Sequence, residues 1–174
     1  MQLITSGDIE PNPGPSEREN VLRLCCQNVC SINNKLGTLR SYAPELASHN
    51  VIGLTETWLG PHVTDSELQL GLDDYVWFRR DRDGRGGGVA CAVRANLSPV
   101  HRPDLEPDCE ALAVQLGTER RIILVVVYRP PDVDADIDKL VQLIRHLRDL
   151  SAPYVMIDEP SLKRQEWLRF RKRA

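Results

Sequence analysis

The sequence lacks any long apolar segment. Its longest uninterrupted apolar run is 122–128, far short of the roughly 20 residues that cross a bilayer. The opening residues MQLITSGDIE have neither the basic start nor the apolar centre of a secretory signal. We therefore expect an intracellular protein, nuclear or cytoplasmic, that does not bind membranes.

A strong excess of basic charge is also missing. The formal net charge is −3, which by itself does not indicate a nucleic-acid partner. The charge is uneven, however, since the segment 161–174 contains six Lys or Arg residues against one Glu. This basic tail could form a helix on nucleic acid or act as a nuclear-import signal, or it could have no role.

The five cysteines are an odd number, and Cys25, Cys26 and Cys30 lie close together. Without an export signal, we expect all five to be reduced thiols. Zinc binding by these three is the alternative. It is disfavoured because adjacent strand residues point to opposite faces and no matching pair lies elsewhere in the sequence.

Strand and helix patterns alternate between residues 21 and 158, which predicts one α/β domain in a chain of 174 residues. The expected strands are 21–29, the first half of 51–59, 75–80, 89–94, 109–116, 120–128 and 154–157. The expected helices are 35–48 and 134–150. Asp134 or Asp136 should cap the second helix. Pro44 should kink the first helix or restart it. The predicted buried face of the second is Ile137, Leu140, Val141, Ile144, Leu147 and Leu150.

Polar side chains stand where four of these strands end. Strand–helix–strand order makes the flanking strands parallel, which places Asn28 beside Glu56 and places Tyr128 and Asp158 at one shared edge. In open α/β sheets, ligands collect at the carboxyl ends of the strands. Taken singly, Glu56 is also explained as a surface acid, Asn28 as a turn residue and Tyr128 as a half-buried aromatic. Their common position indicates a site for a metal or a phosphate.

From about residue 22 to 158 the chain resembles the endonuclease/exonuclease/phosphatase superfamily, which has the deoxyribonuclease I-like fold. The matching pieces are Gln27-Asn28, Leu54-Thr55-Glu56-Thr57-Trp58, Arg85-Gly86-Gly87-Gly88-Val89 and Val127-Tyr128-Arg129-Pro130-Pro131. In order and spacing they most resemble the apurinic-type endonuclease domain of LINE-type (non-LTR) retrotransposons. The resemblance implies an α/β fold, here an incomplete four-layer α/β/β/α sandwich of the DNase I-like type.

The resemblance also implies roles for the strand-end residues. Glu56 would be the principal metal ligand, and Asn28 would assist the metal or a phosphate oxygen. The metal would be Mg²⁺, with Mn²⁺ as an alternative. Tyr128 would contact the scissile phosphate, and Asp158 would position the water. The family's Gly-Asp-Phe-Asn motif is replaced here by Ile157-Asp158-Glu159-Pro160. Its closing Asp-His pair has no counterpart in the 16 residues that follow Asp158.

The implied function is target-site nicking of DNA by a Mg²⁺-dependent endonuclease, with low activity in a truncated domain. The implied partners are DNA and either the missing C-terminal part of the domain or a reverse transcriptase in a longer polyprotein. Candidate contacts to the DNA backbone are Arg80, Arg82, Arg85 and Arg129, although interleaved aspartates also suit a solvated face. The alternatives are a non-catalytic nucleic-acid-binding remnant and a phosphoesterase for small phosphorylated substrates.

Residues 1–20 contain three prolines and no hydrophobic period, which predicts a disordered leader. The segment GDIEPNPGP resembles the ribosome-skipping (2A-like) peptide. This resemblance implies that the bond between Gly14 and Pro15 is not made; a plain proline-rich linker is the alternative. The expected organisation is a leader at 1–20, the N-terminal part of the endonuclease domain at 21–158 and the basic tail at 159–174.

Overall fold

The computed structural model describes residues 21–82, 86–119, 121–130, 135–150, 152–160 and 170–172. The leader with its skip site, Arg85, Asp134 and residues 161–169 of the tail lie outside these ranges. Among the described residues, no helix combines the length and the hydrophobicity that a membrane crossing requires.

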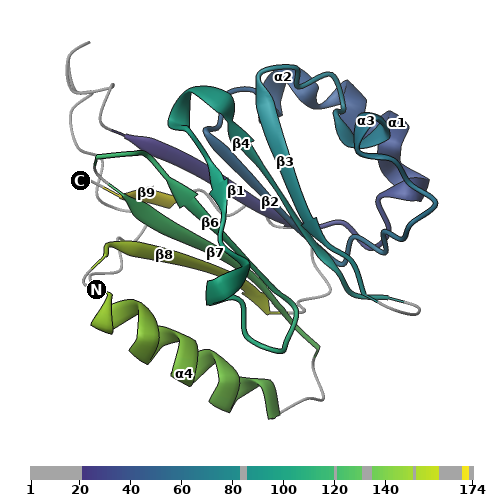
Figure 1. The fold of residues 1–174 in the computed structure, drawn as a ribbon. Helices are drawn as coiled ribbons and strands as arrows, with labels where there is room; N and C mark the ends of the chain where they lie inside the picture. Colours follow the sequence, from purple (N-terminus) through teal and green to yellow (C-terminus); the bar gives the residue numbers. More distant parts are fainter. Residues whose placement is uncertain are drawn as a thin grey trace, which may run out of the picture.

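Two β-sheets form the centre of the molecule (Figure 1). Sheet A has the strand order β3-β4-β2-β1-β9, and sheet B has the order β5-β6-β7-β8. The strands of sheet A are β1 (Leu22–Asn28), β2 (Val51–Thr55), β3 (Tyr75–Arg80), β4 (Val89–Arg94) and β9 (Phe170–Lys172). Those of sheet B are β5 (Val100–His101), β6 (Ala111–Leu116), β7 (Ile122–Arg129) and β8 (Tyr154–Pro160).

The strand pairing follows the expected connections. Strands β1 and β2 are parallel, and so are β7 and β8, so both strand–helix–strand predictions are confirmed. Strands β3 and β4, predicted as separate strands, form an antiparallel hairpin around a glycine-rich segment. At the end of the tail, β9 pairs antiparallel with β1. Residues 170–172 therefore add a strand to sheet A rather than belonging to a basic helix.

Short helices cover the outer face of sheet A, while one long helix lies along sheet B (Figure 1). The helices are α1 (Leu36–Ser41), α2 (Ala43–Leu46), α3 (Asp65–Leu68) and α4 (Ala135–Asp149), with 3-10 turns η2 (Asn33–Lys35), η3 (Ala95–Leu97) and η4 (Pro103–Leu105). The helix expected over 35–48 is interrupted at Tyr42, and Pro44 lies in the first turn of α2. Proline lacks a backbone donor, so it fits the start of a helix better than its interior.

Three apolar clusters fill the spaces between four layers. One packs α1–α3 against sheet A, the second lies between the two sheets, and the third packs sheet B against α4. In the middle cluster, a Cβ added to Gly53 would lie 3.4 Å from Cys26 Sγ and 3.5 Å from Val126 Cγ1. The glycine thus allows the two sheets to approach closely. The predicted α/β/β/α sandwich is confirmed.

The buried face of α4 differs from the predicted one. Leu140, Leu143 and Leu147 are buried, whereas Ile137 is 45% exposed and Val141 is 37% exposed. At about 100° per residue, the buried arc is centred between Leu140 and Leu143. Ile137 and Val141 therefore lie at its margin, and Leu150 follows the helix and is 44% exposed. Leu140 and Leu147 are thus confirmed, whereas the prediction missed Leu143 and wrongly included Ile137, Val141 and Leu150.

Candidate active site

The carboxyl ends of β1 and β2 bring Asn28 next to the Glu56 loop. Asn28 pairs with Thr55, the residue before Glu56. Beyond the strands, the backbone N–H of Ser31 donates to the carbonyl of Glu56, and that of Ile32 donates to the carbonyl of Thr57, both over 2.9 Å. The two loops therefore continue the parallel pairing after the strands have ended.

Glu56 has an unusual backbone for its residue type. Its φ is +54°, in the left-handed region, and Trp58 has a φ of +52°. Non-glycine residues adopt such angles rarely, and they persist only where the surroundings fix them. Trp58 Nε1 donates to Glu56 Oε2 over 2.6 Å, and the Tyr128 hydroxyl donates to Glu56 Oε1. Both carboxylate oxygens are thus oriented by aromatic side chains.

Tyr128 reaches Glu56 from the other sheet. It lies near the end of β7, its side chain belongs to the cluster between the sheets, and it is 4% exposed. Its backbone N–H donates to the carbonyl of Glu110 over 2.9 Å. A buried ring leaves the hydroxyl little freedom, so the position of the oxygen is fixed by packing. The candidate site is therefore formed at one end of the interface between sheets A and B.

Asn28 also organises its own turn. Its Oδ1 accepts hydrogen bonds from the backbone N–H of Cys30 over 3.2 Å and from Cys30 Sγ over 3.1 Å. This side-chain turn is associated with positive φ angles of 40° at Cys30 and 78° at Ser31. Asn28 is thus a turn residue, as one interpretation predicted, and it also lies beside the Glu56 loop.

The fourth predicted residue, Asp158, is offset by one position. Strand β8 was expected to end at Ile157 but runs to Pro160. Its register pairs Val127 with Asp158 and Tyr128 with Glu159. The prediction that Tyr128 and Asp158 share an edge of the sheet is confirmed for the backbone, with an offset of one position that the sequence pattern did not fix. Glu159 is the backbone partner of Tyr128.

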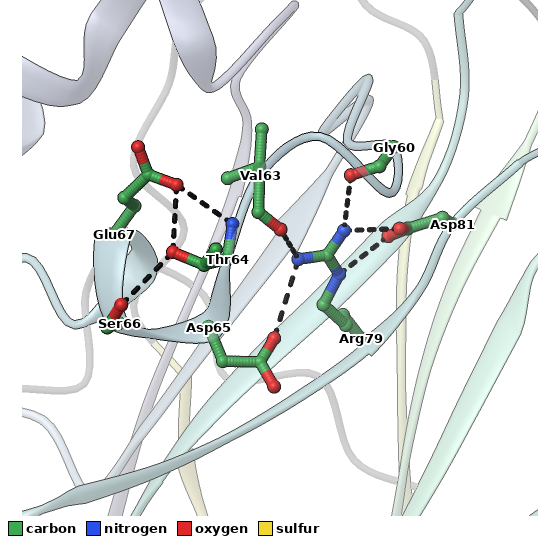
Figure 2. Close-up of polar contacts among 8 residues, drawn as sticks. All are labelled: Gly60, Val63, Thr64, Asp65, Ser66, Glu67, Arg79 and Asp81. Atoms are coloured by element: carbon green, nitrogen blue, oxygen red, sulfur yellow. Dashed lines mark hydrogen bonds and ion pairs between the residues drawn. The ribbon is translucent and has the colours of Figure 1, made fainter.

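The arginines of β3 and the following loop contact the protein itself. Figure 2 shows Arg79 donating to the carbonyls of Gly60 (2.9 Å) and Val63 (2.7 Å) and contacting both Asp81 and Asp65. The hydrogen bond to Asp81 is the main reason that the pKa of Arg79 is raised. Arg79 therefore fastens the loop between β2 and α3 to the edge of sheet A.

The loop beyond Val63 closes with a capping box. In Figure 2, the carboxylate of Glu67 accepts hydrogen bonds over 2.8 Å from the backbone N–H and from the hydroxyl of Thr64. The backbone bond is the larger cause of the lowered pKa of Glu67. A short helix such as α3 gains its N-terminal hydrogen bonds in this way.

Two of the proposed DNA contacts have intramolecular partners. Arg80 Nη1 donates to the carbonyls of Pro107 over 2.9 Å and Ala111 over 3.2 Å, so it connects sheet A to sheet B. Arg82 Nη1 lies 3.1 Å from Glu110 Oε1. Contact of these side chains or of Arg129 with DNA stays a prediction.

The sequence interpretation missed Glu110 and the role of Trp58. Glu110 accepts a hydrogen bond from the backbone N–H of Gly88, within the glycine-rich segment that was noted as one of the matching pieces. No pattern near Glu110 distinguishes it from a surface acid. Trp58 was noted only as part of the matching block, although an indole N–H two residues after an acid can reach that carboxylate when the backbone turns sharply.

No protein-family model matches the chain, and no curated protein matches it by sequence. Solved structures do match it. The chain has a DNase I-like fold. The endonuclease domain of TRAS1, a telomere-specific non-LTR retrotransposon, matches with a TM-score of 0.57 and 13% identity, over 82% of this chain and 60% of that one.

Two further structures show the same likeness. The 3'-5' exonuclease NExo from Neisseria meningitidis matches with a TM-score of 0.58 and 15% identity, over 79% of this chain and 57% of that one. The human Nocturnin catalytic domain with bound sulfate matches with a TM-score of 0.58 and 13% identity, over 82% and 66%. This chain thus spans less than two thirds of each of these three structures, and at such identities the likeness establishes the fold alone.

Proposed function

We propose that this chain is part of a divalent-metal-dependent phosphodiester hydrolase that nicks DNA, as the endonuclease of a non-LTR retrotransposon does. The observation that carries the proposal is the meeting of Glu56 and the Tyr128 hydroxyl across the two sheets, with Asn28 on the adjacent strand end. The proposal is supported by the fold shared with the TRAS1 endonuclease domain. A 3' phosphatase form of NExo with the same fold was solved bound to a product DNA hairpin.

The donor set fits a hard cation such as Mg²⁺, with Mn²⁺ as a substitute. Glu56 supplies a carboxylate and Asn28 an amide oxygen, which are the ligand types that Mg²⁺ takes while it keeps several waters. Both lone pairs of Asn28 Oδ1 accept from Cys30, so Asn28 would bind the metal after one of these hydrogen bonds opens. A carboxylate has about four acceptor sites, and the two hydrogen bonds to Glu56 leave room for a metal bond. Among the described residues, no group of three or more His, Cys, Asp or Glu side chains forms a metal cluster.

When bound, the metal would neutralise charge on the phosphate and lower the pKa of a coordinated water. The protein's own groups supply orientation. The Tyr128 hydroxyl, fixed by its buried ring, donates a hydrogen bond to Glu56. When substrate binds, the same hydroxyl can donate to a phosphate oxygen instead. Asp158 is the acid proposed to orient the attacking water, and Glu159 competes for that role because it is the register partner of Tyr128.

Nicking of supercoiled plasmid in the presence of Mg²⁺ tests the proposal. Glu56→Gln keeps the size of the side chain and removes its charge, and it should lower the nicking rate by about 10²–10⁴-fold, as loss of a positioned acidic group does. Glu119→Gln, at an exposed site, is the matched control and should nick like the parent. Equal nicking by both variants would contradict the proposal. Comparing Asp158→Asn with Glu159→Gln in the same assay assigns the acid of β8.

A phosphatase of the same fold that acts on small phosphorylated substrates is the second candidate. It is favoured by the match to ANGEL2, a 2',3'-cyclic phosphatase, with a TM-score of 0.56 and 16% identity over 79% of this chain and 52% of that one. The RGGGV and YRPP blocks favour the endonuclease instead. Hydrolysis of 2',3'-cyclic nucleotides without plasmid nicking would support the phosphatase. Binding of DNA without either activity would support a non-catalytic remnant.

We also propose that ribosome skipping separates Gly14 from Pro15, so that the mature product begins at Pro15 and remains in the nucleus or cytoplasm. Intact-mass analysis after in vitro translation tests this: a product starting at Pro15 is expected. A single full-length mass would show that the leader is only a linker.

A further inference from the structure

Glu110 contacts both halves of the candidate active site. It directly precedes β6, and its side chain is 19% exposed. Its Oε2 accepts a hydrogen bond of 2.5 Å from the backbone N–H of Gly88, and its Oε1 lies 3.1 Å from Arg82 Nη1. Its main-chain carbonyl accepts the hydrogen bond from the backbone N–H of Tyr128 over 2.9 Å. One residue is thus bonded to the loop at the end of sheet A and to the catalytic tyrosine of sheet B.

The contact with Gly88 extends to Glu56 through the backbone. The carbonyl of Gly87 accepts from the N–H of Trp58 over 2.9 Å, and the carbonyl of Gly88 accepts from the N–H of Thr57 over 3.2 Å. The Trp58 indole then donates to Glu56 Oε2 over 2.6 Å. The Glu110 carboxylate therefore holds the Gly87-Gly88 backbone, and this backbone in turn positions Thr57 and Trp58, the two residues after Glu56.

The glycines explain why a carboxylate can lie so close to this backbone. Gly87 has a φ of +69° and Gly88 a φ of +84°, and a Cβ at Gly87 would overlap both carboxylate oxygens of Glu110. A Cβ at Gly88 would lie 2.6 Å from Thr57 Oγ1. That hydroxyl is buried and has no hydrogen-bond partner among the described residues. The packing leaves no space for side chains, so the glycines and Glu110 specify one arrangement together.

We propose that Glu110 is a positioning residue for Glu56 and Tyr128. The inference rests on the proposed function, because it treats these two as the metal-binding and phosphate-binding groups. Residues that orient a metal ligand without touching the metal typically change metal affinity by about 10–100-fold when they are removed. Glu110 also compensates the charge of Arg82, so its loss would leave that cation without its carboxylate next to the Gly88 backbone.

A metal titration followed through Trp58 tests the inference. The sequence has three tryptophans. For the titration, Trp77 and Trp167 are replaced by Phe in the parent and in every variant, so that Trp58 is the remaining tryptophan. Trp58 then reports on its hydrogen bond to Glu56 as Mn²⁺ or Mg²⁺ is added to the full chain. We expect Glu110→Ala to lower the metal affinity by at least about 10-fold. The metal concentration that gives half of the change in Trp58 emission should rise by that factor. Glu110→Gln retains an oxygen that can accept from Gly88 and should restore part of the loss.

Glu106 provides a matched control for a purely structural effect. Its side chain is 10% exposed, and its Oε1 accepts from the backbone N–H of Ala113 over 3.0 Å and lies 2.7 Å from His101 Nε2. Its Oε2 lies 3.7 Å from Nη1 of Arg80, an arginine of β3. Within the part of the chain that the structure describes, it makes no hydrogen bond or ion pair with the Glu56 loop or with Tyr128. Glu106→Ala should therefore lower thermal stability and leave the metal affinity of the folded protein unchanged. The comparison therefore separates loss of positioning from loss of stability.

Each outcome of the titration decides a different point. If the parent binds metal and Glu110→Ala binds it equally well, the positioning role is overturned and the proposed function stands. If the parent shows no metal-dependent signal and Glu56→Gln behaves identically, the proposed metal site fails, and the inference fails with it. If Glu110→Ala does not fold, the metal affinities of Glu110→Gln and Glu106→Gln are compared instead. A lower affinity for Glu110→Gln alone supports the positioning role, and equal affinities overturn it.

Discussion

At the level of single residues, four non-glycine positions in the two loops of the site have positive φ angles: Cys30, Ser31, Glu56 and Trp58. Each such backbone costs on the order of 1–3 kcal/mol, and it is retained where neighbouring contacts overdetermine it. Here the contacts are the backbone hydrogen bonds between the loops after β1 and β2. The strain therefore lies where the polar groups converge, which agrees with a functional site more than with an ordinary surface turn.

Replacing Tyr128 by Phe removes the hydroxyl and leaves the ring. Because the ring is buried between the sheets, the free energy of unfolding should change little. Loss of one preorganised hydrogen-bond donor should lower the nicking rate by about 10²–10³-fold. Single-turnover rates and urea unfolding measure the two effects. A variant that nicks at the parent rate would show that the Tyr128 hydroxyl serves only to orient Glu56.

The thiols differ in reactivity because they differ in burial. Burial raises the pKa of Cys25 to about 12 and that of Cys109 to about 11, so both stay protonated and unreactive at pH 8. Cys30 is exposed. Brief treatment with iodoacetamide should therefore modify Cys30 first, as peptide mass mapping can show. Since Cys30 Sγ contacts Asn28, the adduct should also slow nicking.

A Cys30→Ser variant is the control for alkylation. Its hydroxyl can replace the thiol as donor to Asn28, and its nicking should resist iodoacetamide. Inactivation of this variant at the parent rate would place the sensitive thiol elsewhere.

At the level of elements, the glycine-rich segment between β3 and β4 has a structural requirement that its sequence only suggested. Gly88→Ala would put a Cβ in contact with Thr57 Oγ1 at a φ of +84°. We expect the free energy of unfolding to fall by about 1–3 kcal/mol. Gly37→Ala in α1 is the control, because nothing lies within 4 Å of its Cβ. That change should stabilise the protein by about 0.4–1 kcal/mol. Equal effects at both positions in urea titrations would contradict this account.

Periodicity predicted the elements better than their details. The alternation of strands and helices was sufficient to place β1, β2, β7 and β8, because apolar runs between turn residues leave few other structures possible. It gave only Leu140 and Leu147 of the buried face of α4, since the leucines, isoleucines and valine of this helix cover more of its surface than sheet B buries. It also did not give the register of β8, which depends on where Tyr154 meets Ile123.

At the level of the whole molecule, the sandwich determines which polar groups can meet. The sequence predicted that Asn28 and Glu56 would lie together because they end neighbouring parallel strands. Tyr128 belongs to the other sheet, and its contact with Glu56 depends on how the sheets pack, which no local pattern encodes. The resemblance to the endonuclease family implied that meeting. It gave no indication of Glu110, whose role depends on contacts between residues 22 positions apart.

Arg80 illustrates the same dependence, because it reads as a DNA contact in the sequence and bridges the two sheets in the structure. Arg80→Ala removes hydrogen bonds to the carbonyls of Pro107 and Ala111. We expect the free energy of unfolding to fall by about 1–3 kcal/mol, as for loss of charge-assisted hydrogen bonds. The salt dependence of DNA binding by Arg80→Ala should stay unchanged. Arg129→Ala is the comparison: loss of one phosphate contact should reduce the slope of log K against log salt by about 0.9. Urea unfolding and DNA binding at several salt concentrations measure both quantities. A reduced slope with unchanged stability for Arg80→Ala would assign this arginine to the DNA instead of the sandwich.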